Sequence, residues 1–141
     1  RKEQSGRYKM EFISYSKKVH FRSIASEDVK SVLDYIRSNA DGMVNKPHAS
    51  DMMALRNVSK ADVSATLANG KLVEYHSYTG HPVALLRHDI NWDSICVAVE
   101  LDTLRIRTTY INSVNDNHGT LKHKEYEQNA KGKINLRIIK V

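Results

Sequence analysis

The apolar periodicity of this 141-residue chain changes at Gly70, and this change constrains the fold more than any other feature. Before Gly70, apolar residues recur at helical spacing, as at Val29, Val32, Leu33 and Ile36. After Gly70, short apolar runs are separated by turn residues, which is typical of strands with short connections and antiparallel pairing. Helices followed by a strand meander predict an α+β fold, with two or three N-terminal helices packed on a four- to five-stranded antiparallel sheet.

Two of the helices have recognisable starts. Ser26 is expected to be the N-cap of the first helix, because its hydroxyl can accept from free amide groups. We expect that helix to end near Ser38, before a turn at Ala40-Asp41-Gly42. Pro47 suits the first position of a second helix, where the missing N–H has no cost.

The third helix has a signal at each end. Ser59 is a good N-cap for a helix over 60–69, and Gly70 is expected to end it in the left-handed conformation. The expected strands cover 10–15, 71–77, 83–88, 94–101, 104–111 and 134–141. We interpret 1–18 as a linker or lead-in and 19–141 as one domain with a core over 45–112.

Composition limits the classes of function. The single cysteine, Cys96, lies in an apolar run, so we expect a buried side chain and no internal disulfide. No apolar run reaches the ~20 residues of a membrane span. The net charge of +6 and the pI of about 9.4 suggest a polyanionic partner, although a basic protein without such a partner is the alternative.

His48 and Arg56, near the two ends of the second helix, are candidates for phosphodiester chemistry. Metal-free RNA cleavage needs a base, an acid and donors for the charge on phosphorus. Histidine titrates near neutrality, and arginine can hold two phosphate oxygens. The first turn of a helix also offers free N–H groups to a phosphate. The alternative is that His48 only caps or packs and that Arg56 pairs with an acid.

The last strand of the meander carries two candidate hydroxyl groups. Strict alternation places Ile106, Thr108 and Tyr110 on one face, where a hydroxyl could orient a phosphate. Thr108 could instead be a simple β-former, and Tyr110 a core aromatic residue. Further candidates for binding RNA are Lys46, Arg87, His88 and Arg107. The alternative for Arg87 and His88 is that they are solvated strand ends.

Metal and cofactor signals are weak. His76, His81 and His88 have no tight metal-ligand spacing and only one cysteine exists, so we expect no zinc site. The six glycines are scattered and form no phosphate-cradling loop, so no nucleotide cofactor is expected. We interpret Glu74 as a partner of an arginine, Arg56 or Arg87, or as a surface residue.

Four short motifs in residues 48–110 together resemble the DUF4258 family. They are, in order, His48-Ala49, Arg56-Asn57-Val58-Ser59, Gly70-Lys71-Leu72-Val73-Glu74-Tyr75 and Thr108-Thr109-Tyr110. DUF4258 is similar to the barnase, EndoU, colicin D/E5 and RelE group of folds, many of which are metal-independent ribonucleases. The resemblance implies that fold, no cofactor, and a catalytic set of His48, Arg56, Thr108 and Tyr110.

That group includes toxin domains at the C-terminus of large secreted bacterial proteins, including contact-dependent inhibition toxins. The resemblance therefore implies an endoribonuclease toxin that cleaves tRNA or other structured RNA by 2′-hydroxyl attack in the target-cell cytoplasm. A start at Arg1 suits delivery as part of a larger protein. An acidic immunity or antitoxin protein is the expected partner. The alternatives are a non-catalytic RNA-binding module and a protein-interaction module on the same fold.

Overall fold

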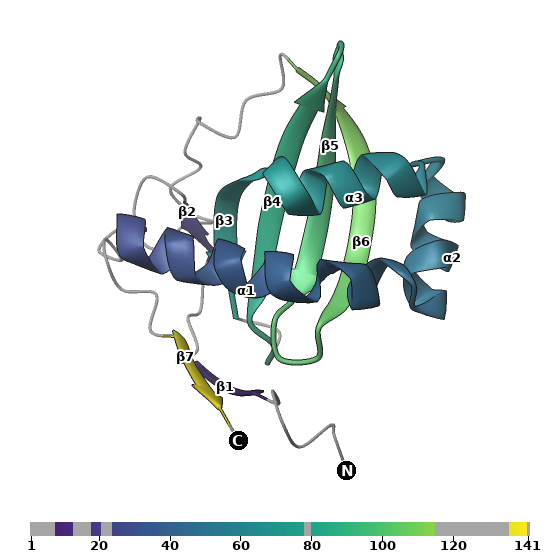
Figure 1. The fold of residues 1–141 in the computed structure, drawn as a ribbon. Coiled ribbons are helices and arrows are strands. Elements are labelled where there is room, and N and C mark those ends of the chain that lie inside the picture. The colour runs from purple at the N-terminus through teal and green to yellow at the C-terminus, as the bar shows by residue number, and fades with distance from the viewer. Residues whose placement is uncertain (1–7, 13–17, 21–23, 78–79, 115–135, 141) are drawn as a thin grey trace.

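The chain folds into three helices and a five-stranded antiparallel sheet, with two further strands outside that sheet (Figure 1). The computed structural model describes residues 8–12, 18–20, 24–77, 80–114 and 136–140. The helices are α1 (Ser26–Val44), α2 (Pro47–Arg56) and α3 (Lys60–Asn69). The sheet, in spatial order, contains β2 (Val19–His20), β3 (Lys71–His76), β4 (Val83–Ile90), β5 (Asp93–Glu100) and β6 (Arg105–Ser113). The predicted α+β fold is confirmed.

The strands near the two ends of the chain pair with each other. β1 (Tyr8–Phe12) and β7 (Leu136–Lys140) form a separate antiparallel pair and do not extend the main sheet. The expected strands over 10–15 and 134–141 overlap them, while 13–17 and 115–135 lie outside the described residues. Among the described residues, none of the helices is long and apolar enough to cross a membrane.

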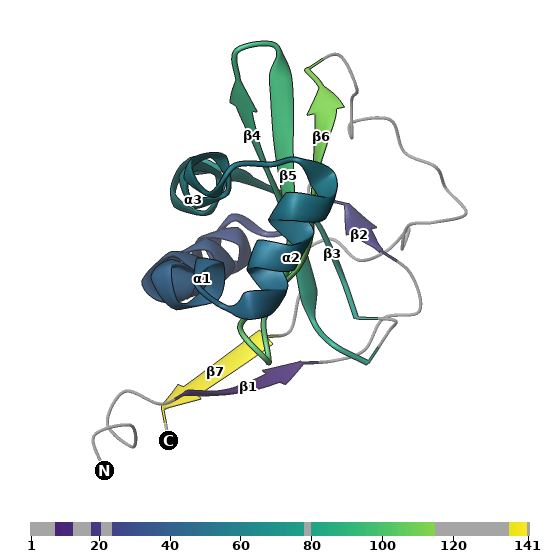
Figure 2. The same ribbon diagram turned by 90° about the vertical axis from the view of Figure 1, so that its right-hand side faces the viewer.

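α1 and α3 lie on one face of the sheet, and α2 lies along the edge strand β6 (Figures 1 and 2). The main core is formed between them and that face, and its largest fully buried side chains include Ile36, Met43, Leu67, Tyr75, Leu86, Ile95 and Ile106. A smaller apolar cluster forms on the opposite side of the sheet, from Val73, Val83, Leu85, Cys96 and Ala98. We call this side, opposite the helices, the far face.

The predicted end of α1 is wrong. The helix continues through the expected turn at 40–42 to Val44, and its N-cap is Ala25, not Ser26. Met43 and Val44 are 1% and 4% exposed. Burying each such side chain contributes about 1.5–3 kcal/mol, which exceeds the ~1 kcal/mol cost of a glycine inside a helix.

The predicted starts of α2 and α3 are confirmed, but the conformation of Gly70 is not. Pro47 opens α2, and the Ser59 hydroxyl accepts from the Asp62 N–H at 3.1 Å. Gly70 has φ −69° and ψ 161°, so it is extended and not left-handed. Glycine is needed there for space, because a Cβ would collide with the carbonyl oxygen of Thr66.

Two β-bulges decide which side chains reach the far face. In β3 the register shifts between Leu72 and Glu74, and in β5–β6 it shifts opposite Arg107. Ile106 consequently packs in the helix-side core, whereas Thr108 pairs with Ala98 of the far face. The expectation that Ile106 and Thr108 share one face is therefore wrong, since a bulge interrupts the alternation.

Candidate active site on the sheet face opposite the helices

The centre of the far face is apolar and is flanked by polar groups from β3, β4 and β6. β5 contributes Cys96 and Ala98, which are small and buried. The register pairs Cys96 with Arg87 on one side and Tyr110 on the other, and Ala98 with Leu85 and Thr108. The polar residues on this face include Glu74, His76, Arg87, Glu100, Arg107, Thr108 and Tyr110.

Tyr110 keeps its phenolic proton over the whole physiological pH range. Burial is the main cause that raises the pKa of Tyr110 well above its ordinary value, and Cys96 and Glu74 add to it. The positive charge of Arg87 acts in the opposite direction. Tyr110 is thus a neutral hydroxyl that can donate a hydrogen bond on the far face.

His76 is held in its neutral form. Burial, together with the positive charges of Arg107 and Lys18, lowers the pKa of His76 to about 4. Lys18 also pairs with Glu74, with 3.6 Å between Nζ and Oε2. At neutral pH the far face therefore combines an uncharged imidazole, a carboxylate and two nearby cations.

Buried Glu100 keeps Arg107 on the far face. Arg107 Nε lies 4.0 Å from Glu100 Oε2, and the Arg107 side chain is 36% exposed. Glu100 also accepts from Thr103 Oγ1 at 2.9 Å and from Arg105 Nη2 at 3.3 Å. Burial opposes ionisation, yet these donors lower the pKa of Glu100, so it stays a carboxylate.

Arg87 extends toward the end of β6. Its Nη2 donates to the Ser113 carbonyl at 3.1 Å, and its Nε lies 3.8 Å from Asp89 Oδ1. Its side chain is 13% exposed. The guanidinium therefore sits at one edge of the far face, and its charge still acts on Tyr110.

His48 lies against β6 next to Thr108, whereas Arg56 lies at the other end of α2. Nε2 of His48 donates to the carbonyl oxygen of Arg107 at 3.3 Å, which ties the start of α2 to β6. Arg56 is exposed and lies eight residues further along α2, about 12 Å away along the axis. The helix thus runs beside β6, while Thr108 and Tyr110 belong to the far face.

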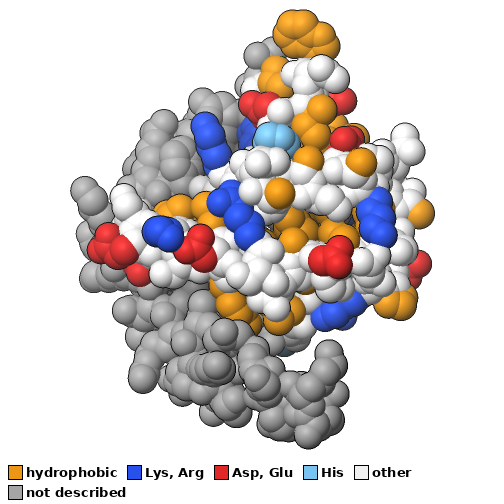
Figure 3. All heavy atoms as spheres, in the orientation of Figure 1, with side chains coloured by type: hydrophobic (Ala, Val, Ile, Leu, Met, Phe, Trp, Pro, Cys, Tyr) orange, Lys and Arg blue, Asp and Glu red, His pale blue; other side chains and the backbone are white. Residues whose placement is uncertain are grey.

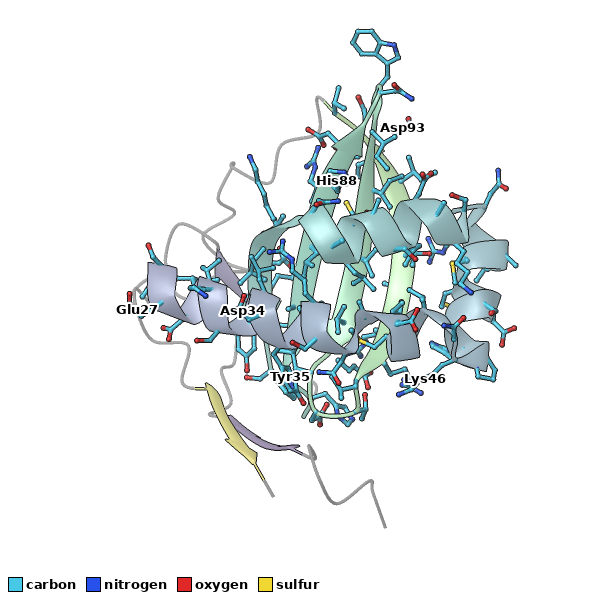
Figure 4. All side chains as sticks on the ribbon, viewed as in Figure 1. Glu27, Asp34, Tyr35, Lys46, His88 and Asp93 are labelled. Atoms are coloured by element: carbon cyan, nitrogen blue, oxygen red, sulfur yellow. The ribbon has the colours of Figure 1, made fainter. Side chains whose placement is uncertain are left out.

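Lys46 and His88 also lie away from the far face. Lys46, at the junction of α1 and α2 (Figure 4), donates through Nζ to the carbonyls of Thr103 and Leu104 at 3.1 and 2.7 Å. His88 pairs in register with Ile95, a residue of the helix-side core, so its side chain is on the helix side of β4 (Figure 4). Of the four predicted RNA-binding residues, Arg87 and Arg107 reach the far face.

Glu74 and His76 are the far-face residues that the sequence interpretation missed as a site. They are two residues apart in β3, so they share a face. The strand that carries them lies next to the strand of Arg87 and across the sheet from Arg107. An acidic residue and a histidine at this spacing are the signal that could have indicated Glu74 and His76 as part of a site. On the helix side, the visible surface of the described residues mixes acidic and basic side chains (Figure 3).

The segment that builds this site matches a known family model. Residues 46–111 match DUF4258, a domain of unknown function. This confirms the resemblance over 48–110. The DUF4258 segment includes α2, α3, β3, β4, β5 and most of β6, so it supplies Glu74, His76, Arg87, Glu100, Arg107, Thr108 and Tyr110 but not Lys18. No curated protein and no solved structure matches the chain significantly.

Proposed function

We propose that this protein is a metal-independent endoribonuclease that cuts tRNA or other structured RNA by 2′-hydroxyl attack, and that its active site is the far face. One observation carries the proposal. A neutral His76 lies under the influence of two cations, Arg107 and Lys18, on the face that also presents Thr108 and Tyr110. These are the base, the phosphate ligands and the hydroxyl donors that such a reaction needs.

His76 is suited to act as the base once a phosphate is bound. In the free protein its pKa of about 4 keeps it neutral but makes it a weak base. The negative charge of a phosphate beside Arg107 and Lys18 offsets the two positive charges that lower this pKa. The pKa of His76 then rises, which makes it a stronger base, while burial, the larger cause, still holds this pKa below its ordinary value.

The remaining groups complete the proton balance. His76 accepts the 2′-hydroxyl proton as that oxygen attacks phosphorus, and a water molecule donates a proton to the departing 5′-oxygen. Tyr110 lies further along the face, opposite Cys96, and donates a hydrogen bond to the bound RNA. Arg107 and Lys18 stabilise the charge that develops on the phosphoryl oxygens. The products are a 2′,3′-cyclic phosphate and a 5′-hydroxyl end.

The biological setting follows from the same proposal. RNA cleavage of this kind inhibits bacterial growth, so the protein acts as a toxin in a target cell. The producing cell then needs an inhibitor, and an acidic immunity or antitoxin protein complements the +6 net charge. Under this proposal, the toxin is delivered to the target cell as part of a larger secreted protein.

Expression of wild type, His76→Gln and His48→Gln in bacteria tests the proposal. Total RNA is run on a denaturing gel, and purified proteins are assayed on tRNA with EDTA present. We expect His76→Gln to lose about 100-fold or more in cleavage rate, the loss typical of a missing general base. His48→Gln serves as the matched control, since its ring contacts a backbone carbonyl of β6.

Three outcomes decide between the alternatives. Wild-type cleavage by a folded His76→Gln protein would refute the far-face mechanism. Loss of cleavage in His48→Gln alone would move the site to α2. RNA that is bound by the wild type but stays intact through long incubation would identify a non-catalytic RNA-binding module.

A further inference from the structure

Three potential metal ligands meet at the end of the sheet where the β3–β4 connection lies beside the β5–β6 turn. His81, Glu100 and Asp102 each offer one ligand atom, and these atoms all lie within 4.8 Å of one another. His81 Nδ1 and Asp102 Oδ2 are 2.7 Å apart. The backbone joins the two segments as well, because the Leu101 N–H donates to the Pro82 carbonyl at 2.8 Å.

Neighbouring groups orient both carboxylates. The second oxygen of Asp102, Oδ1, accepts from the Thr103 N–H at 2.9 Å. The Thr103 hydroxyl donates to Glu100 Oε1 at 2.9 Å. Such outer contacts fix the direction of ligand oxygens and are a regular feature of metal sites. Glu100 is 3% exposed, so its position is well determined by packing.

From this geometry, we propose that His81, Glu100 and Asp102 bind a divalent transition-metal ion, with Zn²⁺ as the ion that best suits the donors. One imidazole and two carboxylates form three protein ligands, which leaves a fourth position for water in tetrahedral coordination. Two carboxylates also balance the two positive charges of the ion. Arg105, which pairs with Glu100 at 3.3 Å, is 45% exposed and can turn toward solvent when the ion binds.

The required movements are small. Ligand atoms that share one Zn²⁺ at about 2.1 Å lie about 3.4 Å apart in tetrahedral geometry. The His81–Asp102 contact must therefore lengthen from 2.7 Å, and the widest separation, up to 4.8 Å, must shorten. His81 and Asp102 have side chains that are 44% and 25% exposed, so rotation of these two suffices.

The bound ion would clamp two connections that are distant in sequence. Nineteen positions separate His81 from Glu100, which is why spacing along the chain did not indicate a zinc site. The inference goes beyond the proposed ribonuclease function, because His81 and Asp102 take no part in that mechanism; Glu100 is shared, since it also pairs with Arg107. Its test needs no RNA, so the two proposals can fail independently.

Titration of untagged, metal-free protein with ZnCl₂ in a non-chelating buffer tests the site by calorimetry. Co²⁺ serves as a second probe, because tetrahedral coordination gives it a strong visible absorption. We expect binding at about one equivalent and a rise in the melting temperature of the wild type. His81→Ala and Asp102→Asn should each weaken binding by about 100-fold or more, since even outer-shell substitutions cost 10–100-fold.

Matched variants separate this site from the other histidines. Asp102→Asn keeps a side-chain oxygen for the Thr103 N–H, so the turn should be preserved. His88→Ala removes a histidine on the helix side of β4 and should leave Zn²⁺ affinity unchanged. The proposal is overturned if wild type binds no Zn²⁺ at millimolar concentration, or if His81→Ala and Asp102→Asn bind it as tightly as wild type.

Discussion

The neutral state of His76 predicts a specific dependence of stability on pH. Burial and two nearby cations lower the pKa of His76 from 6.5 to about 4 in the folded protein. The unfolded chain therefore binds a proton at His76 more readily than the folded chain does. Stability is retained above pH 6.5 and is lost as the pH falls from 6.5 toward 4.

The magnitude follows from the two pKa values. At about 1.4 kcal/mol per pKa unit, a fall from 6.5 to about 4 corresponds to about 3 kcal/mol of lost stability. This is a large part of the 5–15 kcal/mol that typically stabilises a small domain. Carboxylates such as Glu100, whose pKa is also lowered, contribute their own loss as the pH falls. A comparison with a variant is therefore needed to isolate His76.

His76→Gln is the appropriate comparison, because glutamine is polar and stays uncharged at every pH. Urea unfolding of both proteins between pH 7.5 and pH 4 gives the free energy of unfolding at each pH. The stability of His76→Gln minus that of wild type should increase by about 3 kcal/mol as the pH falls over this range. Far-UV circular dichroism at pH 7.5 checks that both proteins are folded.

A constant difference between the two proteins across this range would refute the reasoning. It would mean that His76 titrates alike in the folded and unfolded chains, so that Arg107 and Lys18 do not act on it. The far face would then lack the neutral imidazole on which the proposed base depends. A difference that decreased as the pH fell would show that the folded protein favours the protonated ring.

Substitutions at three further positions test local features by urea or thermal unfolding. Gly70→Ala should cost about 3 kcal/mol, because the new Cβ meets the backbone oxygen of Thr66; a loss below about 1 kcal/mol would contradict that contact. Lys46→Met should cost about 1–2 kcal/mol through its two bonds to turn carbonyls, and an unchanged midpoint would show that these bonds contribute nothing. Asn57 has a φ of 54°, so Asn57→Gly should leave the stability unchanged and Asn57→Ala should cost about 1 kcal/mol. Equal effects of the two substitutions would count against backbone strain at this position.

Local signals predicted α2 and α3 correctly because their determinants lie within one helical turn. Pro47 has its preferred place at the first position of a helix, and Ser59 bonds to an amide three residues later. The strand hairpin between β5 and β6 is equally local. The end of α1 depends on tertiary burial of Met43 and Val44, which outweighs the turn signal of Asp41-Gly42.

The candidate site was only partly predictable, since it depends on contacts between distant strands. Thr108, Tyr110, Arg87 and Arg107 were predicted and lie on the far face. His48 was predicted as a catalytic residue partly because it lies in the first turn of a helix, but its ring bonds to the backbone of β6. His76 was judged by metal spacing alone, and its environment becomes visible only when Lys18 and Arg107 are brought near it.

The two bulges explain why the polar residues gather where they do. In a regular β3 with Leu72 in the core, Glu74 and His76 would point at the helices and Tyr75 would leave the core. In a regular β6 with Ile106 in the core, Thr108 and Tyr110 would point at the helices too.

Each bulge reverses the second half of its strand, and each reversal puts charged or hydroxyl groups on the same far face. One bulge would bury one polar set beneath α1–α3, whereas two bulges keep the helix-side core apolar and unite both sets. Bulges that redirect side chains in this way are common beside active sites, and here they place the imidazole of His76 and the hydroxyls of Thr108 and Tyr110 together on the far face.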